Sequence, residues 1–225
     1  MKSLAARTWQ SLVTLALVMG ALLFVPAGTV RYWQAWLYLV LFFGASALTS
    51  LDLLRRDPAL LERRLKGGPT AETRPVQKFI MLCASTCFVA ALAIPGLDRR
   101  FGWSSVPAGL ALVGDALLLL GFYGVLQVYR VNSFSSATIQ VSGDQRVIST
   151  GPYAIVRHPM YACAGLYLLG TPLGLASYWA FAAVAVMLPF LIWRLFDEER
   201  FLALHLPGYV DYQQRVRYRL LPYVW

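Results

Sequence analysis

The sequence has 225 residues, of which 58% are hydrophobic and only 14% are charged, and its mean hydropathy is +0.57. A soluble domain has roughly 45–50% apolar and about 25% charged residues, so this chain lacks the polar residues that would cover a water-soluble fold. The net charge of +9 comes from short basic segments that leave long apolar runs between them. Composition therefore excludes a soluble domain and predicts an integral membrane protein.

Six apolar runs approach the roughly 20 residues that a helix needs to cross a bilayer. Lipid offers no partners to backbone N–H and C=O groups, and the alternating pattern of barrel strands is absent, so we expect helices. The sequence predicts an all-α, polytopic transmembrane helix bundle of about six helices, the last two forming a tight hairpin. The expected helices span residues 11–26, 32–51, 79–97, 106–128, 160–176 and 178–196.

The first apolar run has an alternative reading as a signal peptide. Lys2 and Arg7 precede it, and Val25-Pro26-Ala27 resembles a cleavage site. Further membrane segments follow at once, which favours a spanning helix.

Basic residues predict the orientation, because cytoplasmic loops of membrane proteins are enriched in Lys and Arg. With the N-terminus in the cytoplasm, 17 of the 20 basic residues lie inside, and only Arg31, Arg99 and Arg100 lie outside. We therefore expect a multi-pass protein with both termini in the cytoplasm. This asymmetry accounts for the net charge without a nucleic acid partner, and contacts with membrane lipids are expected.

Residues 52–78 form the first polar stretch, with seven basic and four acidic residues. Leu60, Leu61 and Leu65 are spaced as in a helix at the membrane surface, and Gly67-Gly68-Pro69 is expected to end it. A surface linker is the favoured interpretation, and a segment that gates or lines a site is the alternative.

The second polar stretch, residues 129–159, is a loop too long for a plain connection, and such loops are usually functional or disordered. Its apolar residues argue against disorder. Turns are expected at Ser142-Gly143-Asp144, between two short extended pieces, and at Gly151-Pro152. Pro159 suits the first turn of a helix, and with Arg157 and His158 beside it this helix start is suited to hold an anion.

The third stretch follows the last apolar run. Arg194, Asp197, Glu198 and Glu199 lie within two turns of a helix, and Glu198 is four residues from Arg194, where an ion pair is possible. A solvated helix end is the plain alternative. The tail beyond is aromatic and basic and is expected in the headgroup layer; it contains Tyr209, Tyr212, Val216, Tyr218 and Trp225.

Asp115 falls within a predicted helix, where a carboxylate is costly unless it has a partner. It could line a cavity, stay protonated, or lie nearer a helix end. Cys83, Cys87 and Cys163 are expected to be small buried residues. With two histidines and no clustered thiols outside the membrane, we expect no metal site.

Two combined motifs resemble a known family. GPYAIVRHPMY at residues 151–161 is followed some forty residues later by Glu198-Glu199, and then by Gly208-Tyr209 and residues 212–222 of the tail. This combination is similar to the isoprenylcysteine carboxyl methyltransferases and the related phospholipid N-methyltransferases. The resemblance covers roughly residues 112–225. We therefore divide the chain into residues 1–105, with three helices and the basic loop, and a methyltransferase-like core at 106–225.

The resemblance implies a membrane methyltransferase that uses S-adenosylmethionine at the cytoplasmic face, with cytosolic loops and the tail forming the site. The acceptor would be lipophilic or small, methylated on a carboxylate oxygen or an amine nitrogen. The implied cofactor-binding residues are Gly151, Pro152, Tyr153, Arg157, His158, Tyr161 and Glu198. Arg194 and Glu199 are the implied catalytic pair, and Glu199 would also close over the cofactor. One departure is Cys163, where the family usually has glycine.

Two other functions remain open from sequence. Membrane sterol reductases, which use NADPH, share the R-H-P-x-Y segment, and Val216 to Pro222 resembles their tail pattern. Glu198-Glu199 and Met160 favour the methyltransferase. A non-catalytic scaffold or transporter is the third reading, although the sequence shows no inverted repeat.

Overall fold

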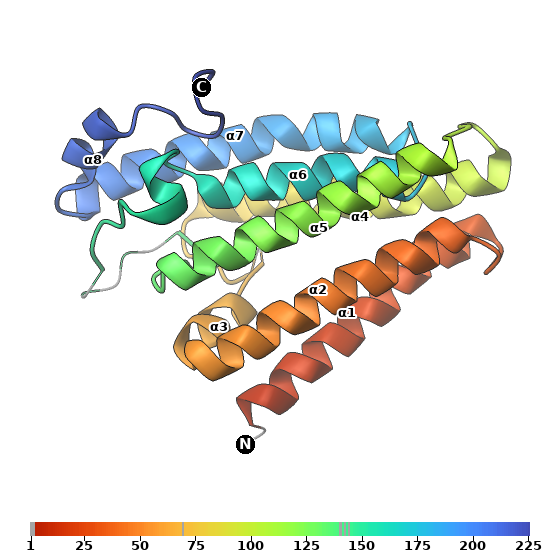
Figure 1. Ribbon diagram of the computed structural model, residues 1–225, viewed down its shortest axis with the longest axis horizontal. Coiled ribbons are helices and arrows are strands. Elements are labelled where there is room, and N and C mark those ends of the chain that lie inside the picture. The colour runs from red at the N-terminus through yellow and green to blue at the C-terminus, as the bar shows by residue number, and fades with distance from the viewer. Residues whose placement is uncertain (1–2, 69, 140, 142, 144) are drawn as a thin grey trace.

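The computed structural model describes residues 3–225 apart from residues 69, 140, 142 and 144 (Figure 1). Within the described residues the chain forms eight α-helices, one 3₁₀ helix and no β-strand, which confirms the predicted all-α fold. The elements are α1 (Leu4–Ala27), α2 (Trp33–Arg56), α3 (Pro58–Leu65), α4 (Pro75–Phe101), α5 (Ala108–Val131), η1 (Gly151–Ala154), α6 (Pro159–Gly174), α7 (Ala180–His205) and α8 (Tyr209–Arg215).

The six expected membrane helices correspond to α1, α2, α4, α5, α6 and α7. Most extend beyond their apolar runs, because charged residues such as Arg and Glu are good helix formers outside the membrane. Five of the six are long and apolar enough to cross a membrane. The exception, α6, has 16 residues, fewer than the roughly 20 that a span requires. Its role as a sixth span stays a prediction.

The surface helix expected in residues 52–78 is α3. The Asp57 carboxylate accepts a hydrogen bond from the Leu60 N–H at 2.9 Å. Pro58 occupies the first turn, where backbone N–H groups have no intrahelical acceptor and the missing N–H of proline costs nothing. Leu60 and Leu61 are buried against Leu53 of α2 and Tyr129 of α5. The leucine spacing thus predicted the helix, while Leu60 and Leu61 contact the bundle itself.

The helices pair in an order that differs from the chain order. α6 packs along α5 and α7 packs along α4, while α6 and α7 make little contact with each other (Figure 1). The connection between α6 and α7 is as short as expected. The predicted tight hairpin is therefore correct for the connection but not for the packing, because each helix lies against a different neighbour.

Glycines bring α5 and α6 into close contact. A Cβ atom at Gly170 would lie 2.5 Å from the Gly114 carbonyl oxygen, and one at Gly114 would overlap the Gly174 nitrogen. Small residues allow such approach in membranes, where helix association depends on close packing. These glycines fix the position of α6 on α5.

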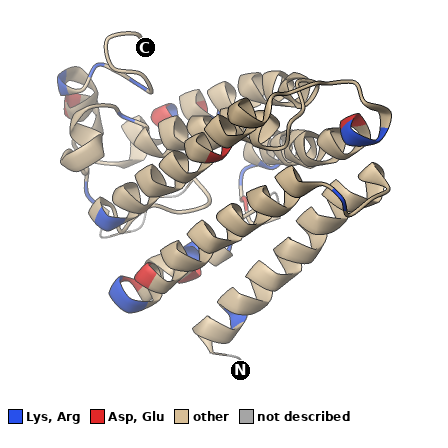
Figure 2. Ribbon diagram, turned by 45° about the vertical axis from the view of Figure 1, so that its right-hand side comes forward, with Lys and Arg blue, Asp and Glu red and all other residues tan. Residues whose placement is uncertain are grey.

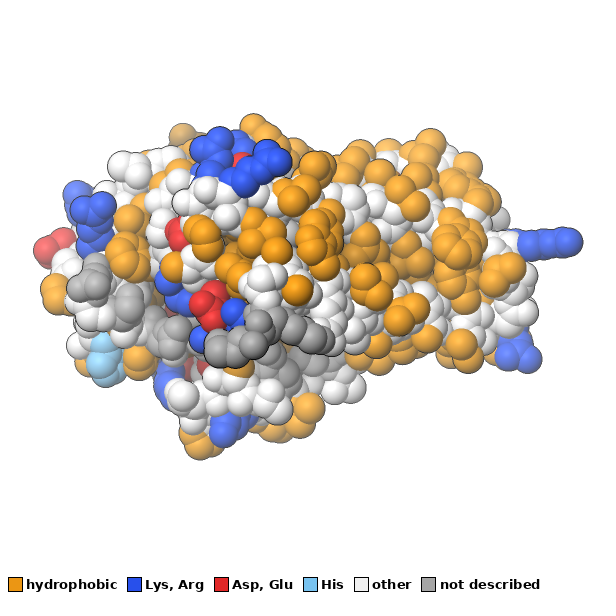
Figure 3. All heavy atoms as spheres, turned by 90° about the horizontal axis from the view of Figure 1, so that it is seen from below, with side chains coloured by type: hydrophobic (Ala, Val, Ile, Leu, Met, Phe, Trp, Pro, Cys, Tyr) orange, Lys and Arg blue, Asp and Glu red, His pale blue; other side chains and the backbone are white. Residues whose placement is uncertain are grey.

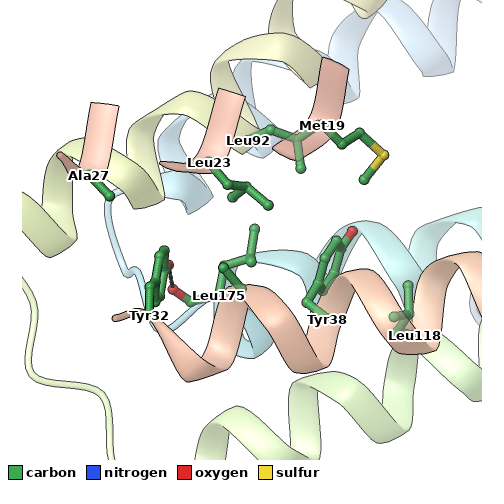
Figure 4. Packing of buried hydrophobic residues seen from close by; sticks show 9 residues of the cluster. Met19, Leu23, Ala27, Tyr32, Tyr38, Leu92, Leu118 and Leu175 are labelled. Carbon is green, nitrogen blue, oxygen red and sulfur yellow. Dashed lines mark hydrogen bonds between the residues drawn. The ribbon is translucent and has the colours of Figure 1, made fainter. Parts of the chain in front are cut away.

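The buried core lies where α1, α2 and α4 meet the far end of α6. Figure 4 shows Leu23 of α1 facing Leu175 and Tyr38, and the Tyr32 hydroxyl donates a hydrogen bond to the Leu175 carbonyl. The Tyr38 hydroxyl also pairs with the Thr171 hydroxyl at 2.9 Å. Both tyrosines thus satisfy their polar atoms while their rings fill the core.

A second network ties the same end of the bundle together. The Asp98 carboxylate at the end of α4 accepts hydrogen bonds from the Ser104 hydroxyl at 2.6 Å and the Ser177 hydroxyl at 2.5 Å. Ser177 lies in the connection between α6 and α7. Asp98 therefore joins the α4–α7 pair to the α5–α6 pair at this end.

Charged residues gather toward the two ends of the long helices in Figure 2. Figure 3 shows that hydrophobic side chains cover much of the middle of one face. Many large hydrophobic side chains of the described structure are exposed, among them Leu17, Val25, Val40, Leu48 and Val186. An apolar outer belt between charged ends is the pattern of a helical protein that crosses a bilayer.

Replacing Gly114 with alanine should destabilise the bundle, because the new methyl group overlaps backbone atoms of α6 that cannot move independently. Overpacking of this kind costs about 1–3 kcal/mol. We expect a lower thermal midpoint for purified Gly114→Ala in detergent. Gly109→Ala is the matched control in the same helix, since a Cβ there meets nothing within 4 Å. Equal midpoints for the two variants would contradict the close contact.

Candidate functional site

A cavity of about 790 Å³ opens among the start of α6, the end of α7, the loop after α5 and the tail. At one end its walls are polar and include Asn132, Tyr153, His158, Tyr161 and Glu198. Farther along, the walls are apolar side chains of the bundle. The apolar part is lined by Leu15, Phe42, Met81, Ala84, Phe88, Phe122, Tyr167, Leu168, Met187 and Leu191. The cavity is large enough for a polar ligand and an apolar ligand side by side.

The R-H-P segment, Arg157 to Pro159, lines one corner of this cavity, which we call the polar corner. Pro159 opens α6 as predicted, and His158 directly precedes it. The Arg157 side chain is buried, and its Nη1 donates to the carbonyl oxygens of Val216 at 3.0 Å and Arg217 at 3.1 Å. The Arg157 donors are therefore directed at the protein, and its expected role beside the cofactor stays a prediction.

Several side chains around this corner contact the carboxylate of Glu199. Its Oε1 accepts from Arg157 Nε at 2.7 Å and lies 3.2 Å from His158 Nε2, and its Oε2 accepts from Arg219 Nε at 3.0 Å. The helix start was expected to hold an anion, and here that anion is the buried carboxylate of Glu199. Charge-assisted hydrogen bonds from several donors compensate the burial of such a charge.

Glu198 has the opposite environment from its neighbour. It is partly buried, it is the acidic side chain along the described walls of the cavity, and its Oε2 accepts from the Tyr161 hydroxyl at 2.8 Å. Tyr161 and Glu198 were both expected at the cofactor, and the structure brings them together. Glu199 was expected there too, but its oxygens face the corner.

The turn predicted at Gly151-Pro152 is η1. Gly151 has a φ of +57°, which favours glycine, and a Cβ there would lie 3.1 Å from Val131. The turn presents Tyr153, whose hydroxyl accepts from Asn132 Nδ2 at 2.8 Å. Burial is the main cause that raises the pKa of Tyr153 to about 12, so its phenol stays neutral at physiological pH.

Arg194 has partners that the sequence did not indicate. Its guanidinium lies 2.7 Å from Glu72 Oε1, and its Nη1 donates to Gln77 Oε1 at 2.6 Å. The ion pair expected with Glu198, and the pairing with Glu199, are therefore replaced by one with the basic loop. The reason is burial: Arg194 and Glu72 are both largely buried, and buried charges require close partners.

A second bond joins the same loop to α7. Arg74 makes two hydrogen bonds to the Asp197 carboxylate, at 2.6 and 2.8 Å, and Gln77 Nε2 donates to it as well. We call Glu72, Arg74, Gln77, Arg194 and Asp197 the loop clamp. The clamp attaches the end of this segment to α7, and Arg64 of the same segment lines the cavity, as the alternative interpretation expected.

The basic segment also holds the loop that covers the cavity. Arg63 donates to the Ser133 carbonyl, and Arg64 donates to the Ser136 carbonyl at 2.8 Å while its guanidinium lies over the Tyr129 ring. The turn expected at Ser142-Gly143-Asp144 falls outside the described residues, apart from Gly143.

Part of the tail packs against the protein. Tyr209, Tyr212 and Val216 are buried with Leu206 in a cluster beside the cavity, and the expected place of the tail in the headgroup layer stays a prediction. Tyr209 lines the cavity and is 4% exposed, and within the described structure its hydroxyl has no hydrogen-bond partner. A Gly-Tyr-x-x-Tyr spacing with Leu206 before it was the available signal for a buried helical face.

Comparison with known proteins identifies the family of this chain. Residues 110–206 match the model of the phospholipid methyltransferase family. The cobalt-zinc-cadmium resistance protein CzcN of Cupriavidus metallidurans is 32% identical over 173 residues, which cover 75% of this chain and 72% of that protein. The chain belongs to the phospholipid methyltransferase family. The polar corner from Gly151 to Glu199 lies inside the matched residues, whereas α8 and the tail lie beyond them.

The departure at Cys163 from the usual glycine has a local compensation in this member of the phospholipid methyltransferase family. A Cβ atom added to Gly124 of α5 would overlap the Cys163 sulfur, so the thiol occupies the space that Gly124 leaves. Cys163 therefore packs against α5 and is not part of the described cavity wall.

Asp115 is buried between α5 and α6 in this member of the phospholipid methyltransferase family. It is 3% exposed, and neither carboxylate oxygen has a hydrogen-bond partner within the described structure. A Cβ at Gly174 would lie 2.8 Å from its Oδ1. Asp115 is absent from the described cavity wall, so of the expected roles that of a cavity-lining acid is not met.

The loop clamp can be tested with a double-mutant cycle on Arg74→Gln and Asp197→Asn. We expect a coupling of about 1–3 kcal/mol in the free energy of unfolding, because the contact is bidentate and Asp197 is well shielded. The matched control is Arg7→Gln with Glu62→Gln, an ion pair whose side chains are both more than 40% exposed. Exposed pairs contribute about 0–1 kcal/mol. A coupling no larger than that of the control would show that the clamp does not form.

Proposed function

We propose that this protein is an S-adenosylmethionine-dependent methyltransferase that modifies a lipophilic or small acceptor at the cytoplasmic face. The observation that carries the proposal is a single cavity with two chemistries. One end offers a carboxylate, a histidine and tyrosines, and the other end is apolar. A water-soluble cation and an apolar acceptor each find a matching environment there.

The residues present fit this cofactor. Glu198 lines the cavity as the acidic group that a sulfonium or an ammonium requires. Tyr209 presents a buried hydroxyl without a protein partner, which is costly unless a ligand accepts from it. Burial, and then the negative charges of Glu199 and Glu198, hold the pKa of Tyr209 well above its ordinary value. Its hydroxyl is therefore a donor at physiological pH.

S-Adenosylmethionine, when bound, supplies a methyl group on sulfur, which an acceptor oxygen or nitrogen takes as the carbon–sulfur bond breaks. We propose that His158, Tyr161, Glu198 and the turn at 151–153 hold the cofactor, and that Arg157 and Glu199 keep His158 in place. The apolar walls exclude water and align the acceptor, and such positioning supplies roughly 7–11 kcal/mol. A carboxylate acceptor needs no base, whereas an amine must first lose a proton, for which Glu198 is the nearby carboxylate.

Arg194 keeps its proposed role at the substrate, because it lines the cavity beside Tyr161. Its side-chain partners are Glu72 and Gln77 of the loop clamp, in place of Glu199. We also propose that both termini lie in the cytoplasm. The basic residues of α3 and of the loop before α4 lie near the cavity, at the end that the positive-inside rule assigns to the cytoplasm.

Ligand binding to detergent-purified protein tests the proposal. By calorimetry we expect S-adenosylmethionine, or its demethylated product, to bind at micromolar strength and NADPH not to bind. Glu198→Gln removes the negative charge that faces the cation, and Tyr209→Phe removes one hydroxyl donor, so each should weaken binding about five- to tenfold. Tyr178→Phe, at the other end of the bundle, is the matched control. Both ligands should be measured with all variants.

The outcomes separate the three functions that the sequence left open. Binding of NADPH without S-adenosylmethionine would replace the proposal with a reductase. Binding of neither ligand to folded protein would leave a non-catalytic role. Normal cofactor binding by both Glu198→Gln and Tyr209→Phe would show that the cofactor lies elsewhere.

A further inference from the structure

The tail beyond α8 is hydrogen-bonded to the corner of the site. The Arg157 N–H donates to the Tyr218 carbonyl, and the His158 N–H donates to the Arg219 carbonyl, both at 2.9 Å. Residues 218–219 therefore run beside the backbone that precedes α6. This brings the Arg219 side chain next to Glu199, which is 20 residues earlier in the chain.

Arg219 holds the side of Glu199 that the other donors leave free. Arg157 and His158 both contact Oε1, and Arg219 Nε donates to Oε2 at 3.0 Å. Glu199 is only 6% exposed. Without Arg219, one oxygen of a buried carboxylate would lose its donor, which favours rotation of the side chain or entry of water.

Two aromatic rings fix the Arg219 guanidinium. It lies 5.2 Å from the centre of the Phe196 ring and 5.5 Å from that of Trp225, and the two rings meet edge-on at 5.9 Å. Stacking against aromatic rings attracts the cation and reduces its conformational freedom. Phe196 lies one turn before Glu199 on α7. The Phe196 ring and the Glu199 carboxylate therefore contact Arg219 from the same helix.

The Trp225 ring is itself held by a backbone turn. The Trp225 backbone oxygen accepts from three successive N–H groups, those of Arg219 at 2.9 Å, Leu220 at 3.0 Å and Leu221 at 3.1 Å. This turn places the Trp225 indole against Arg219, the residue at which the turn begins.

We propose that Arg219 and Trp225 are positioning residues of the site: Trp225 holds Arg219 on Glu199, and Glu199 holds the His158 ring at the cavity wall. The effect on ligand binding rests on the proposed function, whereas the effect on His158 does not. Trp225 acts through its ring, so phenylalanine should substitute for it and alanine should not.

The imidazole of His158 is a direct probe, because the chain contains only two histidines. We would record the Cε1–H resonances of histidine-labelled protein in detergent at fixed pH and assign them with His205→Gln. Trp225→Ala and Arg219→Gln should each shift the His158 resonance and leave that of His205 in place. Trp225→Phe should keep the wild-type position. Val224→Ala, an exposed residue of the same turn, is the matched control.

Calorimetry with the demethylated cofactor gives the functional readout. Trp225→Ala should weaken binding about tenfold or more, since small displacements in a site have large effects, and Trp225→Phe should restore it. Thermal midpoints measured alongside show whether each variant is folded. If Trp225→Ala does not fold, Arg219→Gln serves as the test variant.

An unshifted His158 resonance in folded Arg219→Gln or Trp225→Ala would overturn the proposal. A Trp225→Phe spectrum that matches Trp225→Ala would also overturn it, because the ring would then have no role. Shifted resonances in a protein that binds no S-adenosylmethionine would support the positioning and reject the methyltransferase function.

Discussion

A buried carboxylate near the end of α7 organises the polar half of this protein. Glu199 is almost inaccessible to solvent, and a charge in that position is stable only if donors surround it. Arg157, His158 and Arg219 supply them from two other segments, the start of α6 and the tail. Because the start of α6 and the tail must both reach Glu199, their positions are set together. The cavity, the placement of Glu198 and the burial of Tyr209 all depend on this arrangement.

The rest of the bundle keeps the two sides of the cavity apart. α6 follows α5 through glycine contacts, and α7 follows α4, so the space between α6 and α7 is left for the cavity. Polar networks join the pairs at both ends, Asp98 with Ser177 at one and Glu199 with His158 at the other. Between these ends the walls are apolar. Tight polar connections at the ends and an open middle are compatible with a ligand that enters from the bilayer.

Apolar run length and helix-start signals predicted the helices, α3 and the turn before α6, because these depend on local sequence. The motifs also identified the residues of the corner. Partner choice was not predictable: Arg194 pairs with Glu72, more than 120 residues away, where spacing along α7 suggested Glu198. Likewise, the tail pattern from Tyr209 to Trp225 suits either a headgroup layer or a buried cluster. Only the position of the corner decides between them, and that is set by contacts across the whole chain.

The two partners of the Glu199–Arg219 ion pair are synthesised at different times. α7 and its carboxylate emerge from the ribosome about twenty residues before the arginine that completes the set of donors. At roughly 5–20 residues per second, the interval is short, yet the membrane helices are already being inserted during it. Translation that stalls before Arg219 would release a bundle with its helices complete and its corner unfinished. Residues 218–225 thus complete the site only after the helices have been made.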